Sequence, residues 1–429
     1  MSKPTYVTGM LAAALMMTFS CKKSNTAAKS PTPPAPPPHI SSFSPASAAK
    51  DSAVTIHGTG FSSSISGNLV SFAGKTAVVS AASDTVLVVV VPVGVQDGRI
   101  SVKVGDQSDT STGAFTYIYT ISLMAGSTQG YSDGKGSAAK FLTPMGIAAD
   151  ATGNLFVGDL ANHLIRKITP DGTVSTFAGT YNNSTIINQP NDVAVDASGN
   201  VYVSNMTDGV IGKITPAAVN SNYAGDGFTG YKNGAAATAE FYAPSGIAFD
   251  ASGNLYLADG LNHVIRKIDA GGNVSTFAGD HAPGHKDGAA DTAEFNFPID
   301  VTFDAAGNMY VADQENNMLR KISTSGVVST LAGSGIRATT DGVGVAAAFN
   351  NPLACAVDAH GNVFVTEFYG GNVRRVTAAG VVTTITGSNS VYTDGLGPSA
   401  FSQPYSITID GNGAVYVADA ITEKVMKIQ

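Results

Sequence analysis

Tryptophan is absent from this 429-residue sequence, and cysteine occurs only at Cys21 and Cys355. Because Cys21 ends an apolar leader, the rest of the chain keeps a single cysteine and does not rely on disulfides. No apolar run reaches the 20 residues that a membrane-spanning helix needs. The spacings of zinc sites, phosphate-binding loops, hydrolase nucleophile elbows and EF-hands are also missing. No enzyme motif is therefore available from which a function could be assigned.

Glycine is abundant, with 48 residues, and one stretch of the sequence shows that it occurs in turns between short apolar runs. Between Phe241 and Gly279, short apolar runs alternate with turns rich in Gly, Asn and Asp. The runs are Gly246–Phe249, Leu255–Ala258, His263–Ile268 and Asn273–Ala278. They predict four strands of one small sheet, which cannot bury both of its faces alone and therefore requires copies of itself.

The copies are present, because the pattern recurs six times with a proline in register. These prolines are Pro144, Pro190, Pro244, Pro298, Pro352 and Pro404. The period of 46 to 54 residues is typical of a propeller blade and too long for a solenoid rung. The wording of Asn262–Ile268 (NHVIRKI) and Val415–Asp419 (VYVAD) resembles the NHL repeat from about Tyr119 to the end. The resemblance implies an all-β fold with a six-bladed propeller over residues 119–429.

The sixth copy ends after its third strand, at Gln429. The missing element stands at the other end of the repeats, where Ile121–Gly126 resembles Val274–Gly279. We therefore predict that the strand within 119–126 completes the last blade and closes the ring, which removes the free edges of an open sheet.

The N-terminus has the pattern of a secretory signal over residues 1–20, with Lys3 before an apolar run that ends at Ser20. The small residue before Cys21 resembles a bacterial lipobox, which implies lipidation of Cys21; an ordinary signal peptide is the alternative. Residues 21–38 are rich in proline and predict an extended tether. The whole segment resembles those of Bacteroidetes lipoproteins. We expect an exported protein that is lipid-anchored to the envelope, at the outer membrane, with the side of that membrane left open.

Residues 39–118 alternate short β runs with turns, which predicts a small β-sandwich. The wording of Ile40–Pro45 and Val54–Phe61 resembles an IPT/TIG domain, which implies an immunoglobulin-like fold. We expect this domain to be a spacer, with glycan or protein binding as the alternative. The apolar run Val86–Val91 should form a central or covered strand, because it would promote aggregation at an edge.

Because successive strands of a blade run in opposite directions, alternate connections lie on opposite faces of the propeller. The turns that join strands one to two and three to four share one face, here called the turn face. The loops between strands two and three, and the connections between blades, share the other, here called the loop face. Connections between blades carry Tyr131, Tyr231 and Tyr392, and loops on a rigid scaffold are where binding sites usually lie.

Each second strand ends in a polar residue: Asp159, Asn205, Asp259, Asp313, Glu367 and Asp419. These residues either cap their own turns and pair with the third-strand Arg, or form a polar rim for a sugar, a peptide or Ca²⁺. Asp192 and Asp300 replace the small residues of the other copies and should lie near the channel mouth. His163 and His263 occupy matching positions and are interpreted as framework residues of the third strand, with metal binding as the alternative.

Residues 119–429 contain 16 Lys and Arg against 27 Asp and Glu, a balance of −11, which disfavours nucleic-acid binding. No catalytic or metal-ligand set is assigned, and the lipid anchor is the only membrane attachment that we predict. The leading hypothesis is a non-catalytic envelope lipoprotein whose loop face binds a glycan or protein partner. The alternatives are a metal-dependent lyase or hydrolase acting in the channel, and a purely structural envelope component.

Overall fold

The structure is a computed structural model that describes residues 36–180, 187–386, 391–392 and 401–429. The predicted signal peptide, Cys21 and most of the tether lie outside these residues. Within them, the regular elements are β-strands and short 3-10 helices. No helix there is both long and apolar enough to cross a membrane.

The first 80 or so described residues form a β-sheet that curls almost onto itself. Its elements are β1 (His39–Ser44), β2 (Ser47–Ala49), β3 (Ala53–Thr59), η1 (Ile65–Gly67), β4 (Leu69–Phe72), β5 (Lys75–Ala82), β6 (Val86–Val90), β7 (Gly98–Val104) and β8 (Gln107–Ile118). The strand order is β1-β3-β6-β5-β4-β7-β8-β2. Alternate residues such as Val54, Ile56 and Phe115 point inward and are fully buried. The run at β6 pairs with strands on both sides, as predicted.

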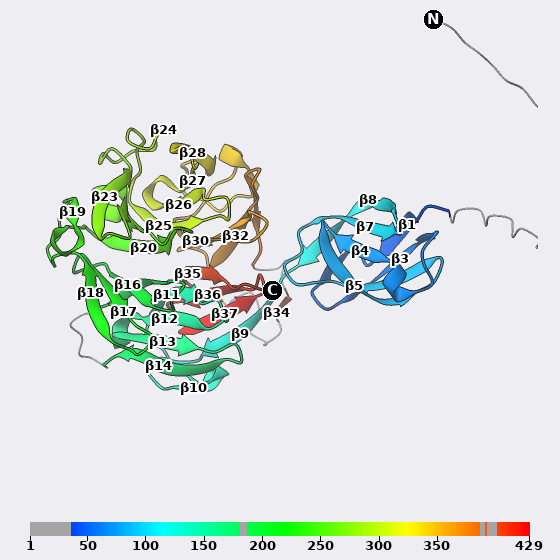
Figure 1. Ribbon diagram of the computed structural model, residues 1–429, viewed down its shortest axis with the longest axis horizontal. Coiled ribbons are helices and arrows are strands. Elements are labelled where there is room, and N and C mark those ends of the chain that lie inside the picture. Colours follow the sequence, from blue (N-terminus) through cyan, green and yellow to red (C-terminus); the bar gives the residue numbers. More distant parts are fainter. Residues whose placement is uncertain (1–35, 181–186, 387–390, 393–400) are drawn as a thin grey trace, which may run out of the picture. The chain divides into compact units, whose positions relative to one another are not determined.

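The remaining strands form the six blades of a propeller (Figure 1). The inner strands are β11 (Pro144–Ala149), β15 (Pro190–Val195), β20 (Pro244–Phe249), β25 (Pro298–Phe303), β30 (Pro352–Val357) and β35 (Pro404–Ile409). The second strands are β12 (Leu155–Asp159), β16 (Val201–Asn205), β21 (Leu255–Asp259), β26 (Met309–Asp313), β31 (Val363–Glu367) and β36 (Val415–Asp419). The third strands are β13 (Leu164–Ile168), β17 (Val210–Ile214), β22 (Val264–Ile268), β27 (Met318–Ile322), β32 (Asn372–Val376) and β37 (Lys424–Ile428). The fourth strands are β14 (Thr173–Gly179), β18 (Asn220–Ala224), β23 (Asn273–Ala278), β28 (Val327–Ala332), β33 (Val381–Thr384) and β9 (Thr120–Gly126).

Ring closure follows the prediction. Strand β9 precedes the first blade in sequence but is the fourth strand of the sixth blade, antiparallel to β37. The register pairs Ile121 with Ile428 and Ala125 with Val425. All four of these residues are fully buried; Ile121 and Ile428 belong to one buried cluster, and Ala125 and Val425 belong to another, so the two ends of the repeat region pack together in both.

Four strands per blade was an incomplete prediction, because five of the six sheets carry a short fifth strand at the outer edge. These strands are β10 (Gly134–Lys135), β19 (Gly234–Ala235), β24 (Gly288–Ala289), β29 (Gly342–Val343) and β34 (Val391–Tyr392). The connection that leads into each of these five blades therefore first pairs with the blade's fourth strand and then continues to its inner strand. The first four of these strands are followed directly by a short turn or 3-10 helix, including η2 (Gly136–Ala138), η4 (Ala236–Thr238) and η7 (Gly344–Ala346).

The turn face is built from repeated Asp-to-Asn turns. In the third blade, Oδ1 of Asp250 accepts the backbone N–H groups of Ser252 and Asn254, both at 2.9 Å. The Asn254 side chain donates to the other carboxylate oxygen of Asp250 at 2.7 Å, and Gly253 supplies the positive φ of 80° that the turn requires. The carboxylates on this face therefore serve local turns.

Candidate functional site

The polar residues that end the second strands lie inside the blades. Asp159, Asp259, Asp313, Glu367 and Asp419 have no exposed surface, and Asn205 is 2% exposed. In four blades the carboxylate meets a third-strand arginine that is equally buried: Arg166, Arg266, Arg320 and Arg374. Of the two interpretations of these residues, the structure supports pairing with arginine and places none of the side chains on a rim.

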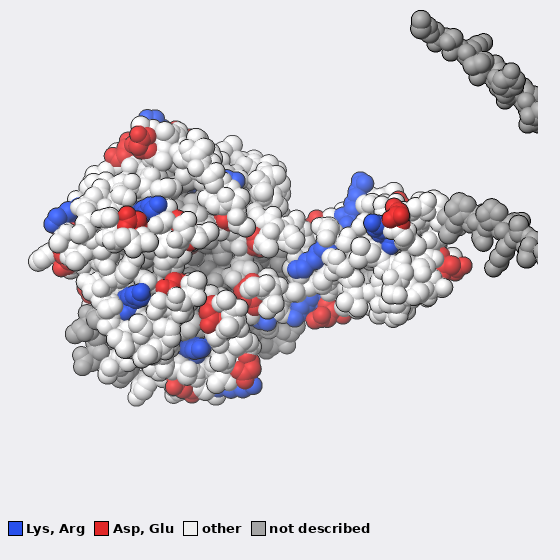
Figure 2. Space-filling view, in the orientation of Figure 1, with Lys and Arg blue, Asp and Glu red and all other residues white. Residues whose placement is uncertain are grey.

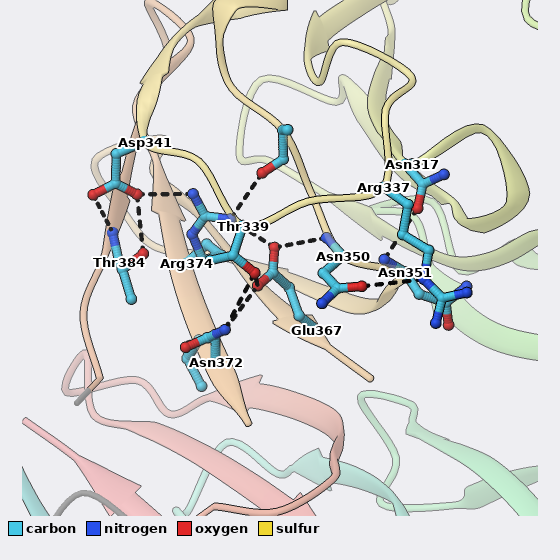
Figure 3. Close-up of polar contacts among 12 residues, drawn as sticks. Asn317, Arg337, Thr339, Asp341, Asn350, Asn351, Glu367, Asn372, Arg374 and Thr384 are labelled. Atoms are coloured by element: carbon cyan, nitrogen blue, oxygen red, sulfur yellow. Dashed lines mark hydrogen bonds and ion pairs between the residues drawn. The ribbon is translucent and has the colours of Figure 1, made fainter. Parts of the chain in front are cut away.

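The fifth blade shows the complete arrangement (Figure 3). One terminal nitrogen of Arg374 donates to Glu367 at 2.6 Å and to the carbonyl of Ala348 at 3.1 Å. The other donates to Asp341 at 2.8 Å. The guanidinium also lies 5.4 Å from the ring centroid of Phe349, which is fully buried. The arginine thus joins the second strand to both arms of the connection that enters the blade, while its Nε is left without a partner.

Two blades lack the arginine, and in both the residue at the end of the second strand has a different environment. In the second blade, Gly212 stands where Arg would lie, and the second strand ends in neutral Asn205. In the sixth blade, Met426 replaces the arginine, and the Asp419 carboxylate accepts backbone N–H groups instead. Wherever the acid is kept, its charge is compensated inside the protein.

His163 and His263 are turn residues rather than members of the third strand, where the sequence had placed them. Both adopt left-handed backbone conformations, with φ of 56° and 57°, directly before β13 and β22. The other four blades have Gly209, Asn317, Gly371 and Glu423 there, all at positive φ. Nδ1 of His263 accepts the N–H of Phe297 in the next blade at 3.2 Å. These histidines are therefore structural, as the sequence favoured. Among the described residues, no group of three or more His, Cys, Asp or Glu is arranged to hold a metal ion.

Asp192 and Asp300 do lie on the propeller axis. Each uses one carboxylate oxygen to accept a backbone N–H of the next blade, with Ile247 donating to Asp192 at 2.9 Å and Cys355 donating to Asp300 at 2.7 Å. The second oxygen of Asp192 lies 3.4 Å from the hydroxyl of Ser406. Small residues at the matching positions of other blades leave room for the acids: a side chain on Gly246 would collide with Oδ1 of Asp300.

The axis is filled at its loop-face end, so neither aspartate lies at an open mouth there. One layer closer to the loop face, the hydroxyl of Tyr405 donates to the side chain of Asn191 at 2.9 Å, and Asn191 donates to Ser245 at 2.8 Å. Ile299 and Leu353 complete this layer and are 5% and 3% exposed. The remaining space is about 10 Å³, at the limit for one water molecule. This layer was not singled out from the sequence, although the residue directly after the proline differs from blade to blade, as with Asn191, Ser245 and Tyr405.

On the turn-face side of the two aspartates, the axis opens into a cavity of about 220 Å³. Its floor is formed by Asp192, Asp300 and Ser406. Its walls include Ala148, Val195, Ala248, Phe249, Thr302 and Thr408. Because the inner strands run from the loop face to the turn face, these wall residues lie toward the turn face. The accessible space on the axis is therefore on the face opposite to the one that the sequence indicated.

The two axial carboxylates repel each other in a poorly solvated channel. Burial raises the pKa of Asp192 to about 7. Burial and the nearby charge of Asp192 also raise the pKa of Asp300 well above its ordinary value. No lysine or arginine lines the cavity to compensate either charge. Near neutral pH the pair therefore retains a proton.

The predicted tyrosines lie at the rim of the propeller, away from these aspartates. Tyr131 and Tyr231 precede β10 and β19, which are outermost strands, and are 53% and 41% exposed. Tyr231 stacks on His281 with centroids 4.3 Å apart. Tyr392 belongs to outer strand β34, and its side chain is outside the described residues. The structure thus separates the tyrosines from the axial acids.

Family models match two parts of the chain: the IPT/TIG domain over residues 38–119 and the Teneurin NHL domain over residues 125–286. Teneurin-3 of Danio rerio is 26% identical over 344 residues, which covers 70% of this chain and 12% of that protein. NHL repeat-containing protein 2 of Bos taurus is 37% identical over 92 residues, covering 21% of this chain and 12% of that protein. The chain spans about an eighth of the length of these curated relatives.

Solved structures share the fold over most of the chain. A Bacteroides thetaiotaomicron protein described as a structural genomics protein of unknown function has a TM-score of 0.63 at 22% identity, covering 92% of this chain and 99% of its own. An auxiliary nutrient binding protein from the same organism has a TM-score of 0.55 at 17% identity, covering 92% of this chain and 98% of its own.

The buried arginine predicts a stability test in the fourth blade. Arg320→Met should lower the free energy of unfolding by about 3–5 kcal/mol, because Asp313 would remain buried without its partner. Adding Asp313→Asn, which imitates the second blade, should recover a large part of that loss. Urea unfolding measures both, with Lys321→Met on the same strand as control. Equal stability of the Arg320→Met and Lys321→Met variants would contradict this role.

The raised pKa of Asp192, about 7 against an ordinary 3.8, predicts a pH effect on stability. The folded state binds the extra proton, so the contribution of Asp192 to stability is fully present below its ordinary pKa and is lost as pH rises through about 7. Acidification from about pH 8 to about pH 5.5 should therefore raise the melting temperature of the wild type relative to Asp192→Asn. Thermal unfolding at both pH values checks this, with exposed Glu315→Gln as control. Parallel pH profiles for wild type and Asp192→Asn would refute it.

Proposed function

We propose that this NHL-repeat propeller protein with an N-terminal IPT/TIG domain is a non-catalytic binding protein whose loop face takes a glycan or protein partner. One observation carries the proposal. Among the described residues, every exposed aromatic side chain belongs to the loop face: Tyr131, Phe228, Tyr231, Tyr242 and Tyr369. Water-exposed aromatic rings gathered on one face are typical of binding surfaces.

Part of this set forms a patch on the third blade, defined by Phe228, Tyr242 and Leu261, which are 72%, 44% and 42% exposed. The N–H of Leu261 donates to the carbonyl of Tyr242 at 3.1 Å. The bridge between Thr229 and Phe241 brings Phe228 beside the same segment. We call these three residues the blade-three patch. Its backbone is fixed by hydrogen bonds, so the rings are presented with little loss of conformational freedom on binding.

A second group lies where the fifth blade begins. The guanidinium of Arg337 is 3.9 Å from the ring centroid of Tyr369. Arg337 also donates to the side chain of Asn350 at 3.2 Å (Figure 3). Ile336, beside it in the chain, is 68% exposed. Aromatic rings flanked by polar groups suit a sugar, whose apolar face stacks on a ring while its hydroxyls are hydrogen-bonded, and they also suit a protein hot spot.

Charge argues against a nucleic-acid partner. The propeller region has a balance of −11, from 16 basic and 27 acidic residues. On the face of the propeller drawn in Figure 2, basic side chains are scattered singly among acidic ones rather than gathered into a stripe. Binding that depends on phosphate neutralisation would require such a stripe.

The solved structures support ligand binding of a nutrient type. Two of them, from Bacteroides thetaiotaomicron and Bacteroides ovatus, are called auxiliary nutrient binding proteins and cover 92% of this chain at 17% identity. A glycan is the nutrient class that suits exposed aromatic rings, so we favour it over a protein partner. The competing hypothesis, a lyase or hydrolase in the channel, would have to act from the turn face, because the loop-face end of the axis is filled.

The loop-face proposal is tested by binding to an array of neutral and acidic oligosaccharides. Replacing the blade-three patch by Phe228→Ser, Tyr242→Ser and Leu261→Ser should weaken binding by about tenfold or more, because stacking area is lost. The matched control replaces the exposed turn-face residues Val219, Val327 and Val381 by serine, which removes apolar surface from the opposite face. If the control variant loses binding and the patch variant keeps it, the binding site lies on the turn face instead. If neither variant loses binding, the blade-three patch is not the binding site.

We further propose that export and a lipid on Cys21 hold the protein at the cell envelope. The support is the sequence pattern of residues 1–21, together with a proline-rich segment long enough to serve as a tether. Cys21→Ala should move the protein from the membrane fraction to the soluble fraction. Fractionation followed by mass spectrometry of the N-terminus measures this. A Cys21→Ala variant that is processed and still sediments with membranes would refute the anchor.

A further inference from the structure

The blade-three patch has a counterpart in the fifth blade that is built from different side chains. The N–H of Ala338 donates to the carbonyl of Phe349 at 3.1 Å. In the third blade, Gly230 donates to Phe241 in the same way. This shared register, together with the pairing of the second and third strands, identifies the blade-five equivalents of the patch as Ile336, Asn350 and Tyr369. The same corner of the repeat is therefore apolar in one blade and largely polar in another.

Arg337 adds a positive charge to this corner. The matching position in the other arginine-paired blades holds Gln129, Thr229 and Pro283. The propeller region has six arginines, and five of them are buried and paired with an acid. Arg337 is exposed, and no carboxylate in the part of the chain that the structure describes lies within ion-pair distance of it. It is thus a charged group whose partner the protein does not supply there.

The guanidinium of Arg337 is nevertheless held in one orientation. One of its faces lies 3.9 Å from the ring centroid of Tyr369. Its Nε donates to Oδ1 of Asn350 at 3.2 Å (Figure 3), and Asn350 is itself fixed because its backbone N–H donates to the buried Glu367 at 3.0 Å. The two terminal nitrogens of Arg337 donate to none of the described residues. A flat, oriented guanidinium therefore presents its free edge to a ligand.

We propose that Arg337 binds the carboxylate of a uronic acid residue in a glycan; this rests on the loop-face function proposed above and names the class of glycan. The two terminal nitrogens of a guanidinium match the two oxygens of a planar carboxylate, which is the geometry of a bidentate pair. Because Nε is already bound to Asn350, the carboxylate approaches the end of the side chain. The ligand then supplies the countercharge that the other propeller arginines find within the protein.

The side chains beside Arg337 suit the sugar ring that carries the carboxylate. Because arginine has no acceptor, Oδ1 of Asn350 must face it, and Nδ2 of Asn350 has no acceptor among the described residues. The next residue, Asn351, accepts from Gln314 at 2.9 Å, and its own Nδ2 makes no hydrogen bond within the described ranges. These amides can donate to sugar oxygens. Ile336, which is 68% exposed, offers apolar surface for the C–H face of the ring.

A uronic acid suits this site better than two other anions. A sulfate ester has tetrahedral oxygens, so it cannot lie in the guanidinium plane as a carboxylate does. An acidic peptide presents its carboxylate at the end of a flexible side chain, whose ordering on binding costs conformational entropy. In a uronic acid the carboxylate is attached directly to a rigid ring, so less freedom is lost when it is held by an arginine that is already oriented.

The test is isothermal titration calorimetry of the purified full chain with trigalacturonate and with cellotriouronate at about pH 7. Each is compared with its fully methyl-esterified form, which keeps the sugar and removes the charge. We expect at least one of the two acids to bind about tenfold or more tightly than its ester. Raising NaCl from about 0.05 M to about 0.5 M should reduce this preference, because the arginine is exposed to solvent.

Three variants and a control locate the effect at Arg337. Arg337→Gln should weaken binding of the acid by about tenfold or more and leave binding of the ester unchanged. Arg337→Lys keeps the charge without the two-nitrogen edge, so it should bind the acid less tightly than the wild type. Asn350→Asp gives Arg337 an acid within the protein and should also weaken binding of the acid. Lys286→Gln removes an exposed positive charge from the connection into the fourth blade and should bind like the wild type.

The outcomes separate this inference from the loop-face proposal. If acid and ester bind equally and the serine variants of the blade-three patch lose both, the loop face binds glycans but the uronic acid assignment is wrong. If no sugar binds up to about 10 mM, both proposals fail. The inference is also overturned if Lys286→Gln loses as much affinity as Arg337→Gln. Tighter binding of 6-sulfated galactotriose or of hexa-aspartate than of either uronate would replace the uronic acid by a sulfate or a peptide.

Discussion

A fully buried arginine paired with a fully buried acid is the contact on which four of the six blades depend. Because Arg320 has no exposed surface, every donor that it leaves unpaired is costly, and the blade must bring acceptors to it. Asp313 arrives from the second strand, while Asp287 and the carbonyl of Glu294 arrive from the connection that enters the blade. In these four blades the connection before the inner strand therefore passes close to the arginine, on which its acceptors converge. Blades without the arginine either neutralise the acid or supply it with backbone donors.

The polar groups on the propeller axis also need hydrogen-bond partners, but here they find backbone donors and no arginine. Asp192 and Asp300 also accept backbone N–H groups from neighbouring blades, but no cation accompanies them. Burial raises the pKa of both groups, and the charge of Asp192 raises that of Asp300 further, so the pair retains a proton that compensates part of its charge. The two ends of the axis then differ sharply. The loop-face end is packed around Tyr405 and Asn191, whereas the turn-face end stays open above the carboxylates. Exposed aromatic rings and an acidic cavity thus occupy opposite faces of one scaffold.

Sequence reasoning was most successful where the repeat itself carried the information. Alternating apolar runs with Asp and Gly turns predicted the blades, and the missing last strand predicted the pairing of β9 with β37, because an unpaired edge would be exposed otherwise. It was less successful for single side chains. The second-strand acids were recognised as a set, but their burial depended on arginines seven residues further on and on connections some 30 residues away. The residues directly before the short outer strands supply the second partner of each arginine: Asp133, Asn233, Asp287 and Asp341. The histidines were placed in the third strand, although they terminate the preceding turn at positive φ.

Composition and periodicity alone determined that this chain forms a short sandwich-like sheet and a closed ring of six blades, since local turn chemistry and alternation act within one repeat and are copied six times. They also singled out Asp192 and Asp300, because a charged residue breaks a pattern of small ones. Only the tertiary structure decided what those departures do. Whether an axial carboxylate faces an open mouth or the floor of a cavity depends on side chains from all six blades meeting at one axis. Tyr405 and Asn191 are 214 residues apart in sequence and in contact across that axis, and no pattern within a single repeat encodes such a contact.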